Sequence, residues 1–259
     1  MMWMYNIPLV LLGIFVVGST MALSMGGYVL LHRVFPGKRS DETKNLAISF
    51  IGIVCAFHSL LLAFSSVLVW RDFQSSAQAV SKETNSVEDV YRDLLRYDGP
   101  QARAAATTLV TYVRVVVTEE WARMAHGKES DKARALAAQI FQEAGSLDPK
   151  TPREQVIFAE IFRHLNEFMD NRHERVHDAQ SAMPAMFWTI TLIATGLLIG
   201  YTGMLPRSRV VLTMIAGMSA AIGLIFFFIV ALDHPFSGQY PVSPQPLVEF
   251  LEEVGKPAQ

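Results

Sequence analysis

The chain has 259 residues, of which 51% are hydrophobic and 18% are charged, and its formal net charge is −2. The apolar residues are concentrated in four uncharged runs and the mean hydropathy is +0.27, so the composition favours a multi-pass membrane protein over a soluble globular one. The near-neutral charge, without a basic stripe, argues against nucleic acid as a partner, and the single cysteine, Cys55, leaves no disulfide framework or thiolate metal site.

The first uncharged run, residues 7–31, is predicted to be a retained transmembrane helix. A secretory signal is the alternative, but the run lacks a basic segment before it and is longer than the apolar core of such a signal. Gly18, Ala22 and Gly26 repeat every four residues, and small residues at this spacing allow another helix to approach closely.

The second run, residues 46–70, contains no Asp, Glu, Lys or Arg and can cross the roughly 30 Å hydrocarbon core as a helix. Its one ionisable side chain, His58, lies near the middle, with Phe50, Phe57 and Phe64 around it. One interpretation is a pore that this histidine and these aromatic side chains line. The alternative, which we favour, is a neutral histidine bonded to a hydroxyl group of a neighbouring helix.

Residues 71–182 are predicted to be a helical extramembrane domain. A seam of mostly apolar residues spaced alternately by four and three continues from the second crossing; it consists of Phe73, Ala77, Val80, Thr84, Val87, Tyr91 and Leu94. We predict helices over residues 101–126 and 130–147, although the β-branched run 113–118 also fits a short strand. Thr151-Pro152-Arg153-Glu154 predicts a capping box at the start of the last helix, whose expected apolar face holds Phe158, Phe162, Leu165 and Met169.

Two further uncharged runs, residues 183–205 and 210–232, are predicted to form the third and fourth crossings. The expected fold is therefore all-α, with four transmembrane helices arranged as hairpins over residues 1–70 and 183–232 and the helical domain inserted between them. The prolines and glycine after residue 232 predict an extended tail over residues 233–259.

The two short loops between the crossings are basic. They contain Arg33, Lys38, Arg39, Lys44, Arg207 and Arg209. Because positive charge in short loops marks the cytoplasmic side, we expect these loops in the cytoplasm of a cell (inner) membrane, with the insert and both termini on the periplasmic or extracellular side.

Asp233 lies where the fourth crossing meets water. We expect it to pair with Arg71, Arg172 or Arg175 at the same membrane surface, while Pro235 and Phe236 anchor the tail. An ion or partner contact at the mouth of the bundle is the alternative.

No set of residues indicates catalysis. Glu119 and Glu120 are adjacent and so do not share a helix face, and His173 and His177 have no acidic or cysteine ligand at a metal-binding spacing. We expect no enzyme, no cofactor and no metal site.

Several of these features together resemble a bestrophin-like family of membrane proteins that carries a domain of unknown function. The most specific is Asp233-x-Pro235-Phe236-Ser237-Gly238 with Val242-Ser243-Pro244, and weaker ones are Glu119-Glu120-Trp121, Arg172 and Arg175. Position 58 departs from the family pattern, because an aromatic hydroxyl is expected where His58 stands.

The resemblance implies the layout of bestrophins, which are pentameric anion channels with four crossings and a cytosolic helical domain after the second. That placement of the domain conflicts with the loop charges, and we follow the charges. The expected function is an oligomeric ion channel or small-ion transport protein, with the lipid bilayer, further copies of the chain and a small inorganic ion as partners. The alternative is a non-conducting membrane-anchored sensor or scaffold whose helical domain binds a partner.

Overall fold

The computed structural model describes residues 7–37 and 40–256, and its secondary structure is helical, with no strand in that part of the chain. The chain divides into two compact units. The first contains Met1–Arg71 and Ala182–Asp233, and the second contains Asp72–Ser181 and His234–Gln259. Four helices are long and apolar enough to cross a membrane: α1 (Leu9–Val34), α2 (Asp41–Tyr97), α7 (Ala185–Thr202) and α8 (Arg209–Leu232).

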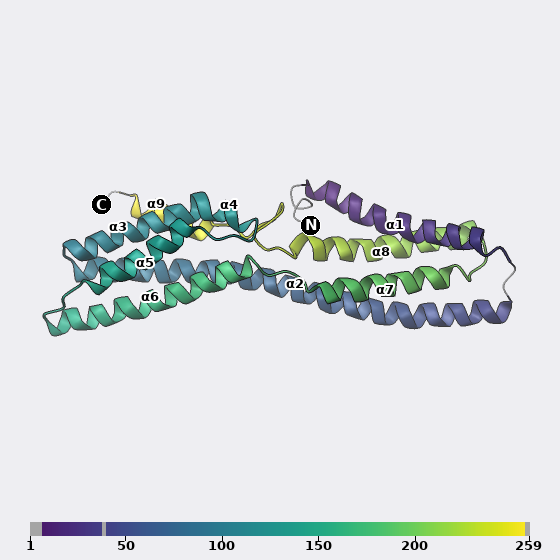
Figure 1. The fold of residues 1–259 in the computed structure, drawn as a ribbon, viewed down its shortest axis with the longest axis horizontal. Coiled ribbons are helices and arrows are strands. Elements are labelled where there is room, and N and C mark those ends of the chain that lie inside the picture. Colours follow the sequence, from purple (N-terminus) through teal and green to yellow (C-terminus); the bar gives the residue numbers. More distant parts are fainter. Residues whose placement is uncertain (1–6, 38–39, 257–259) are drawn as a thin grey trace. The chain divides into compact units, whose positions relative to one another are not determined.

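In the first unit, α1 and α8 lie side by side (Figure 1). Their backbones approach closely at Gly223, where an added Cβ would lie 2.9 Å from the Cα of Val17. A glycine is therefore needed at this crossing, because a side chain would force the helices apart. Tyr28 on α1 bonds to the loop between α7 and α8. Its hydroxyl donates to the carbonyl of Pro206 (2.8 Å) and accepts from the backbone N–H of Ser208 (3.2 Å).

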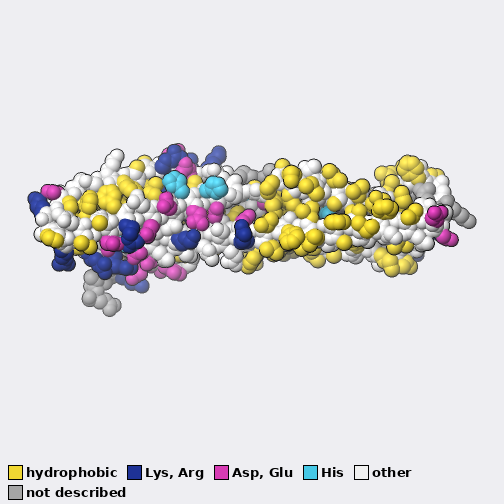
Figure 2. Space-filling model, turned by 90° about the horizontal axis from the view of Figure 1, so that it is seen from below, with side chains coloured by type: hydrophobic (Ala, Val, Ile, Leu, Met, Phe, Trp, Pro, Cys, Tyr) yellow, Lys and Arg dark blue, Asp and Glu magenta, His cyan; other side chains and the backbone are white. Residues whose placement is uncertain are grey.

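The surface of this unit is apolar. Figure 2 shows hydrophobic side chains gathered over the spanning helices, whereas charged side chains gather over the helices of the second unit. Large apolar residues such as Val10, Phe57 and Met214 are more than half exposed. Such a surface suits contact with lipid or with another membrane helix.

The second unit contains the later part of α2 together with α3 (Pro100–Val115), η2 (Val116–Glu120), α4 (Trp121–Met124), α5 (Asp131–Gly145), α6 (Pro152–Asp178) and α9 (Gln245–Val254). Its core includes Val87, Leu94, Leu109, Ile140 and Phe168, all fully buried. The seam predicted along residues 73–94 lies inside this unit, because its members pack within the cores of the unit itself.

The structure contains most of the helical features predicted for residues 71–182. Thr151 forms the predicted capping box, with its side chain bonded to the Glu154 backbone and the Glu154 carboxylate bonded back. The run 113–118 is helical and not a strand, although its end is a π turn. On α6 the fully buried face holds Ile161, Leu165 and Phe168, whereas Phe158 and Phe162 are only partly buried, so the predicted apolar face is rotated.

The tail differs from the expectation of an extended segment over 233–259. Its residues 245–254 form α9, and residues 257–259 lie outside the described part. Pro246 suits the first turn of this helix, where its missing N–H costs nothing. Leu247 and Phe250 are three residues apart and both buried, so this short helix is stabilised by one apolar face packed into the core.

Candidate functional site

The membrane segment of α2 presents different residues on different faces. Phe50, Phe57 and Phe64 are spaced by seven residues, and their side chains are 46%, 71% and 62% exposed. Seven residues are nearly two helical turns, so these rings form one stripe along the helix. His58 follows Phe57 by one residue, which turns it about 100° away from the stripe. The structure therefore does not bring His58 and the aromatic residues together on one face.

His58 points into the bundle of the first unit, and only 2% of its surface is exposed. Its ring meets the ring of Phe226 on α8 edge to face, with 6.3 Å between the centroids. Neither ring nitrogen has a hydrogen-bond partner within residues 7–37 and 40–256. The expected bond to a hydroxyl group of a neighbouring helix is therefore not formed, and an apolar ring occupies the face that the histidine meets.

Asp233 ends α8, and its carboxylate accepts a hydrogen bond from the backbone N–H of Met183 (2.6 Å). Met183 lies just before α7, where free N–H groups and the helix dipole favour a negative charge. Arg71, one of the three expected partners, is exposed. The other two, Arg172 and Arg175, have carboxylate partners within the second unit.

The second unit contains a buried network of charged side chains. Arg175 is fully buried and pairs with Glu83 and with Glu120, the latter at 2.9 Å. Arg172 donates to the other oxygen of Glu120, also at 2.9 Å, and the hydroxyl of Tyr112 donates to Glu83 at 2.5 Å. Two carboxylates thus face two guanidinium groups, so the charges are paired although they are removed from water.

Burial and these partners change the acid–base behaviour of the network. Burial, reinforced by the Glu83 carboxylate, raises the pKa of Tyr112 well above its ordinary value, so the phenol stays protonated and donates. Burial alone would lower the pKa of Arg175, but Glu83, Tyr112 and Glu120 outweigh it and raise that pKa. Arg175 also lies over the ring of Trp121, 5.5 Å from its centroid. The paired and hydrogen-bonded side chains are suited to fixing how the helices pack.

The π turn η2 places Glu120 in this network. Trp121 donates its backbone N–H to the carbonyl of Val116, five residues earlier. Glu120 is fully buried and also accepts from the backbone of Ser130 (3.0 Å), whereas the adjacent Glu119 faces outward and pairs with Lys132 (2.6 Å). The two neighbouring carboxylates therefore have different surroundings, as adjacent positions on a helix require.

The tail motif that begins at Pro235 packs within the second unit. Phe236 is 3% exposed and meets Trp121 edge to face, with 5.6 Å between centroids. The Ser237 hydroxyl donates to the carbonyl of Ala125 (2.6 Å), Trp121 Nε1 donates to the carbonyl of Val242 (3.2 Å), and Pro235 accepts from the backbone of Val242 (2.7 Å). This set of contacts holds the start of the tail to α4 and to Ala125 at its C-terminal end.

The histidines of α6 contact other groups of the protein; His164 Nδ1, for example, lies 2.8 Å from Asp93. His173 Nδ1 lies 3.0 Å from the carbonyl of Met169, and the described residues contain no group of three or more His, Cys, Asp or Glu side chains that could hold an ion.

Comparison with known proteins identifies the family. A family model for the bestrophin-like domain matches residues 18–247. The chain belongs to the bestrophin-like family. Among solved structures, a variant of a bacterial bestrophin homologue from Klebsiella pneumoniae is 10% identical, with a TM-score of 0.68 over 94% of this chain and 99% of that one.

Other solved structures agree on the fold. A further variant of the Klebsiella pneumoniae homologue is 12% identical, with a TM-score of 0.65 over 93% and 98% of the two chains. A structure described as a membrane protein is 13% identical, with a TM-score of 0.63 over 93% and 96%. No curated protein matches the sequence. The bestrophin-like protein is thus a helical membrane protein with the fold of bacterial bestrophin homologues.

Proposed function

We propose that this bestrophin-like protein is one subunit of a homo-oligomeric channel for a small inorganic ion. Bestrophins are known as ion channels, and the fold supports the same class of function here. The observation that carries the proposal is the stripe formed by Phe50, Phe57 and Phe64. Its rings are 46%, 71% and 62% exposed, and Phe50 stacks on Tyr201 of α7 with 5.6 Å between the centroids. Rings of apolar side chains can constrict a pore and close it by excluding water.

Open small-residue positions support assembly with further copies. At Gly18 and Gly26, no atom of another helix lies within 4 Å of the position that a Cβ would occupy, and Ala22 between them is exposed. The close contact of α1 with α8 uses Gly223 in place of this stripe, so the stripe is free for a helix of another subunit. In this arrangement α2 faces the pore and the other spanning helices face lipid and neighbouring subunits.

His58 then lies in the wall of the pore and not on its surface. Its burial against Phe226 and its rotation away from the aromatic stripe support this assignment. We expect it to influence the pore only through the packing of α2 against α8.

The charges of the short loops support a cytoplasmic position for these loops in the cell (inner) membrane. Arg33, Lys44, Arg207 and Arg209 lie at the ends of the spanning helices, and the expected Lys38 and Arg39 lie outside the described residues. The second unit and both termini would then be periplasmic or extracellular.

Planar-bilayer recording of the purified protein tests the channel. Phe57→Ala removes a large side chain from the stripe and should raise the single-channel conductance, whereas Phe228→Ala, on the half-exposed surface of α8, should leave it unchanged. If His58 instead faced the pore, conductance would change between about pH 5 and 8, and His58→Phe would abolish that change. A wild type that is silent with every ion tested would favour the sensor or scaffold.

A further inference from the structure

Two grooves of opposite charge lie beside α2 in the second unit. The first, between α2 and α3, is lined by two guanidinium groups and no carboxylate, and we call it the basic groove; its charged residues are Arg103 and Arg114. The second, between α2 and α6, is lined by three carboxylates and one ammonium group, and we call it the acidic groove; its charged residues are Asp89, Glu167, Asp170 and Lys82. Their volumes are similar, about 340 and 380 Å³.

The rotation of α2 places the two grooves on opposite sides of this helix. Its Lys82 and Asp89 line the acidic groove, whereas its Tyr91 and Leu95 line the basic groove. Lys82 and Tyr91 are nine residues apart, which is about two and a half helical turns. A copy of the chain that presents its basic groove on one side of α2 therefore presents its acidic groove on the other.

Each groove holds one charge that is unpaired. Arg103 pairs with Asp98 at 2.8 Å, and the charges of the acidic groove other than Asp170 have partners of their own. Arg114 and Asp170 are exposed, and neither forms an ion pair with another described residue. The basic groove also includes Leu95, whose side chain is 50% exposed. One cation and one anion thus remain for contact with another chain.

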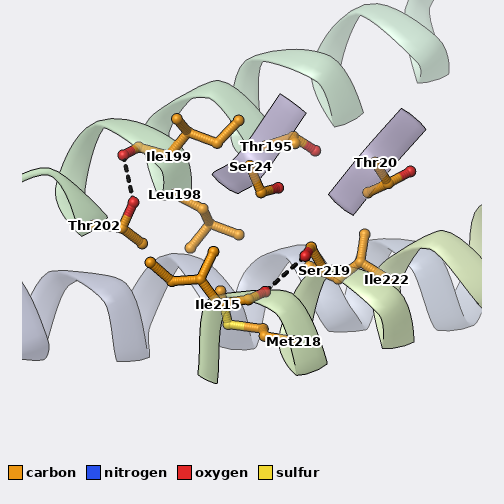
Figure 3. Close-up of a pocket in the computed structure, with 10 residues that line it drawn as sticks. All are labelled: Thr20, Ser24, Thr195, Leu198, Ile199, Thr202, Ile215, Met218, Ser219 and Ile222. Carbon is orange, nitrogen blue, oxygen red and sulfur yellow. Dashed lines mark hydrogen bonds between the residues drawn. The ribbon is translucent and has the colours of Figure 1, made fainter. Parts of the chain in front are cut away.

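In the first unit, hydroxyl groups between α1, α7 and α8 are bonded within their own helices. Thr202 donates to the carbonyl of Ile199 (2.7 Å) and Ser219 to that of Ile215 (2.6 Å), as Figure 3 shows. The outer surface of this unit is apolar (Figure 2), so it favours contact with other membrane helices without fixing which surfaces meet. Charged groups give such selectivity, and they lie in the second unit.

We infer that the basic groove of one copy of this chain contacts the acidic groove of the next copy. The inference rests on the proposed homo-oligomer and specifies which surfaces of neighbouring subunits meet. Because the two grooves are different surfaces, the contact is head to tail, and contacts of this kind close into a ring when the rotation between copies allows it. Arg114 of one copy then pairs with Asp170 of its neighbour.

Other occupants of the grooves fit less well. A symmetric pair of copies would bring two basic grooves together, and like charges facing each other oppose association. A small anion or an acidic peptide could bind the basic groove but would leave the acidic groove without a partner. A second copy of the chain accounts for both grooves at once.

Cysteine cross-linking of the full chain in proteoliposomes tests the contact. Cys55→Ala removes the native thiol, and Asn85→Cys in the acidic groove with Thr111→Cys in the basic groove keeps every groove charge. With both cysteines present, a short thiol-to-thiol cross-linker should join copies into a ladder that ends at a closed ring, whereas either cysteine alone should give no product. Dimers from Thr111→Cys alone would overturn the inference, because two basic grooves would then meet.

Charge reversal gives a second test, in which the mass of the complex is measured in mild detergent at a series of dilutions. Arg114→Glu should raise the concentration at which the oligomer dissociates by about tenfold, because like charges then face each other. Asp170→Arg in the same chain should restore the wild-type value, because the reversed charges attract again. Arg153→Glu is the control, since it changes the net charge equally at an exposed residue that lines neither groove. Equal effects of Arg114→Glu and Arg153→Glu, or no recovery in the double variant, would show that the grooves do not meet.

The same measurements separate this inference from the proposed oligomer. An oligomeric wild type that gives no cross-link between positions 85 and 111 overturns the inference alone. A wild type that is monomeric at every concentration overturns both.

Discussion

The buried charge network makes a sharp prediction about two adjacent glutamates. Glu120→Ala should leave Arg172 and Arg175 without their shared carboxylate in a site where all three side chains are at most 3% exposed. Removing one partner of a buried ion pair costs about 3–5 kcal/mol when buried charge is left without full pairing. Here Arg175 keeps Glu83, but Arg172 keeps only the more distant and partly exposed Glu129, at 3.6 Å. Glu120 also accepts from the backbone of Ser130, which then loses its acceptor.

Glu119→Ala is the matched control in the same π turn. It removes the pair with Lys132, in which both side chains are about half exposed, and such surface pairs contribute about 0–1 kcal/mol. The expected difference between the two variants is therefore about 2–5 kcal/mol in the free energy of unfolding.

Denaturant unfolding followed by the fluorescence of Trp121 measures this difference locally, because Trp121 contacts both Arg175 and Phe236. The other tryptophans are replaced by phenylalanine in all proteins compared. Free energies of unfolding for the two variants that agree within about 1 kcal/mol would refute the reasoning, since burial and pairing would then not govern the cost. Arg175→Met with Glu83→Gln should cost less than Glu120→Ala, because Glu120 and Arg172 stay paired and no buried charge loses its partner.

Two further predictions concern pH and orientation. The pKa of Asp178 is raised, first by burial and also by Glu174 and Asp72, against the hydrogen bond from Ser76 and the charge of His177. Because its folded pKa lies above the unfolded one, its contribution to stability is complete below the unfolded pKa and is lost as pH rises through the folded pKa. As pH rises from the unfolded to the folded pKa of Asp178, the melting temperature of wild type should therefore fall relative to that of Asp178→Asn. A difference in melting temperature that stays constant from acid to neutral pH would contradict the raised pKa. For orientation, a reporter active only in the periplasm and fused after Gly127 should be active, whereas activity of a cytoplasm-only reporter there would reverse the topology.

The spanning helices could be predicted because each one corresponds to a long uncharged run in the sequence. Long runs without charge must be helical in a membrane, since every backbone group has to be satisfied within its own segment. The four candidate spans overlap the four predicted crossings, with ends that differ by a few residues. The exception is α2, which continues into the second unit as a 57-residue helix. The capping box at Thr151 was equally predictable, because it depends on four consecutive residues.

The charge network was not predicted, although the sequence contains a signal for it. On α6, Arg172 and Arg175 continue the buried series Ile161, Leu165 and Phe168 with the same alternating spacing of four and three. A charged residue in register with an apolar face indicates a buried pair, and Glu83 follows Val80 and precedes Val87 in the same way on α2. What the sequence could not give is the pairing, because the partners come from three different helices and the π turn that turns Glu120 inward depends on their packing.

The sequence also could not predict which face of α2 packs inside the subunit and which is exposed at the candidate pore. The sequence places His58 and the three phenylalanines on one helix, but which of them meets the rest of the bundle depends on how that helix is rotated. The structure turns His58 toward Phe226 and leaves Phe57 and Phe64 more than half exposed, while Phe50 stacks on Tyr201 of α7. A mid-membrane ionisable group is therefore a poor guide to the pore surface here, because burying its polar atoms inside a subunit only requires a donor or acceptor such as water. The rings of Phe57 and Phe64 are more than half exposed and carry no group that a water molecule could satisfy by hydrogen bonding. A water-filled pore, lipid or a second subunit must cover them. For this reason the conductance of Phe57→Ala, more than that of any His58 variant, decides whether α2 lines a pore.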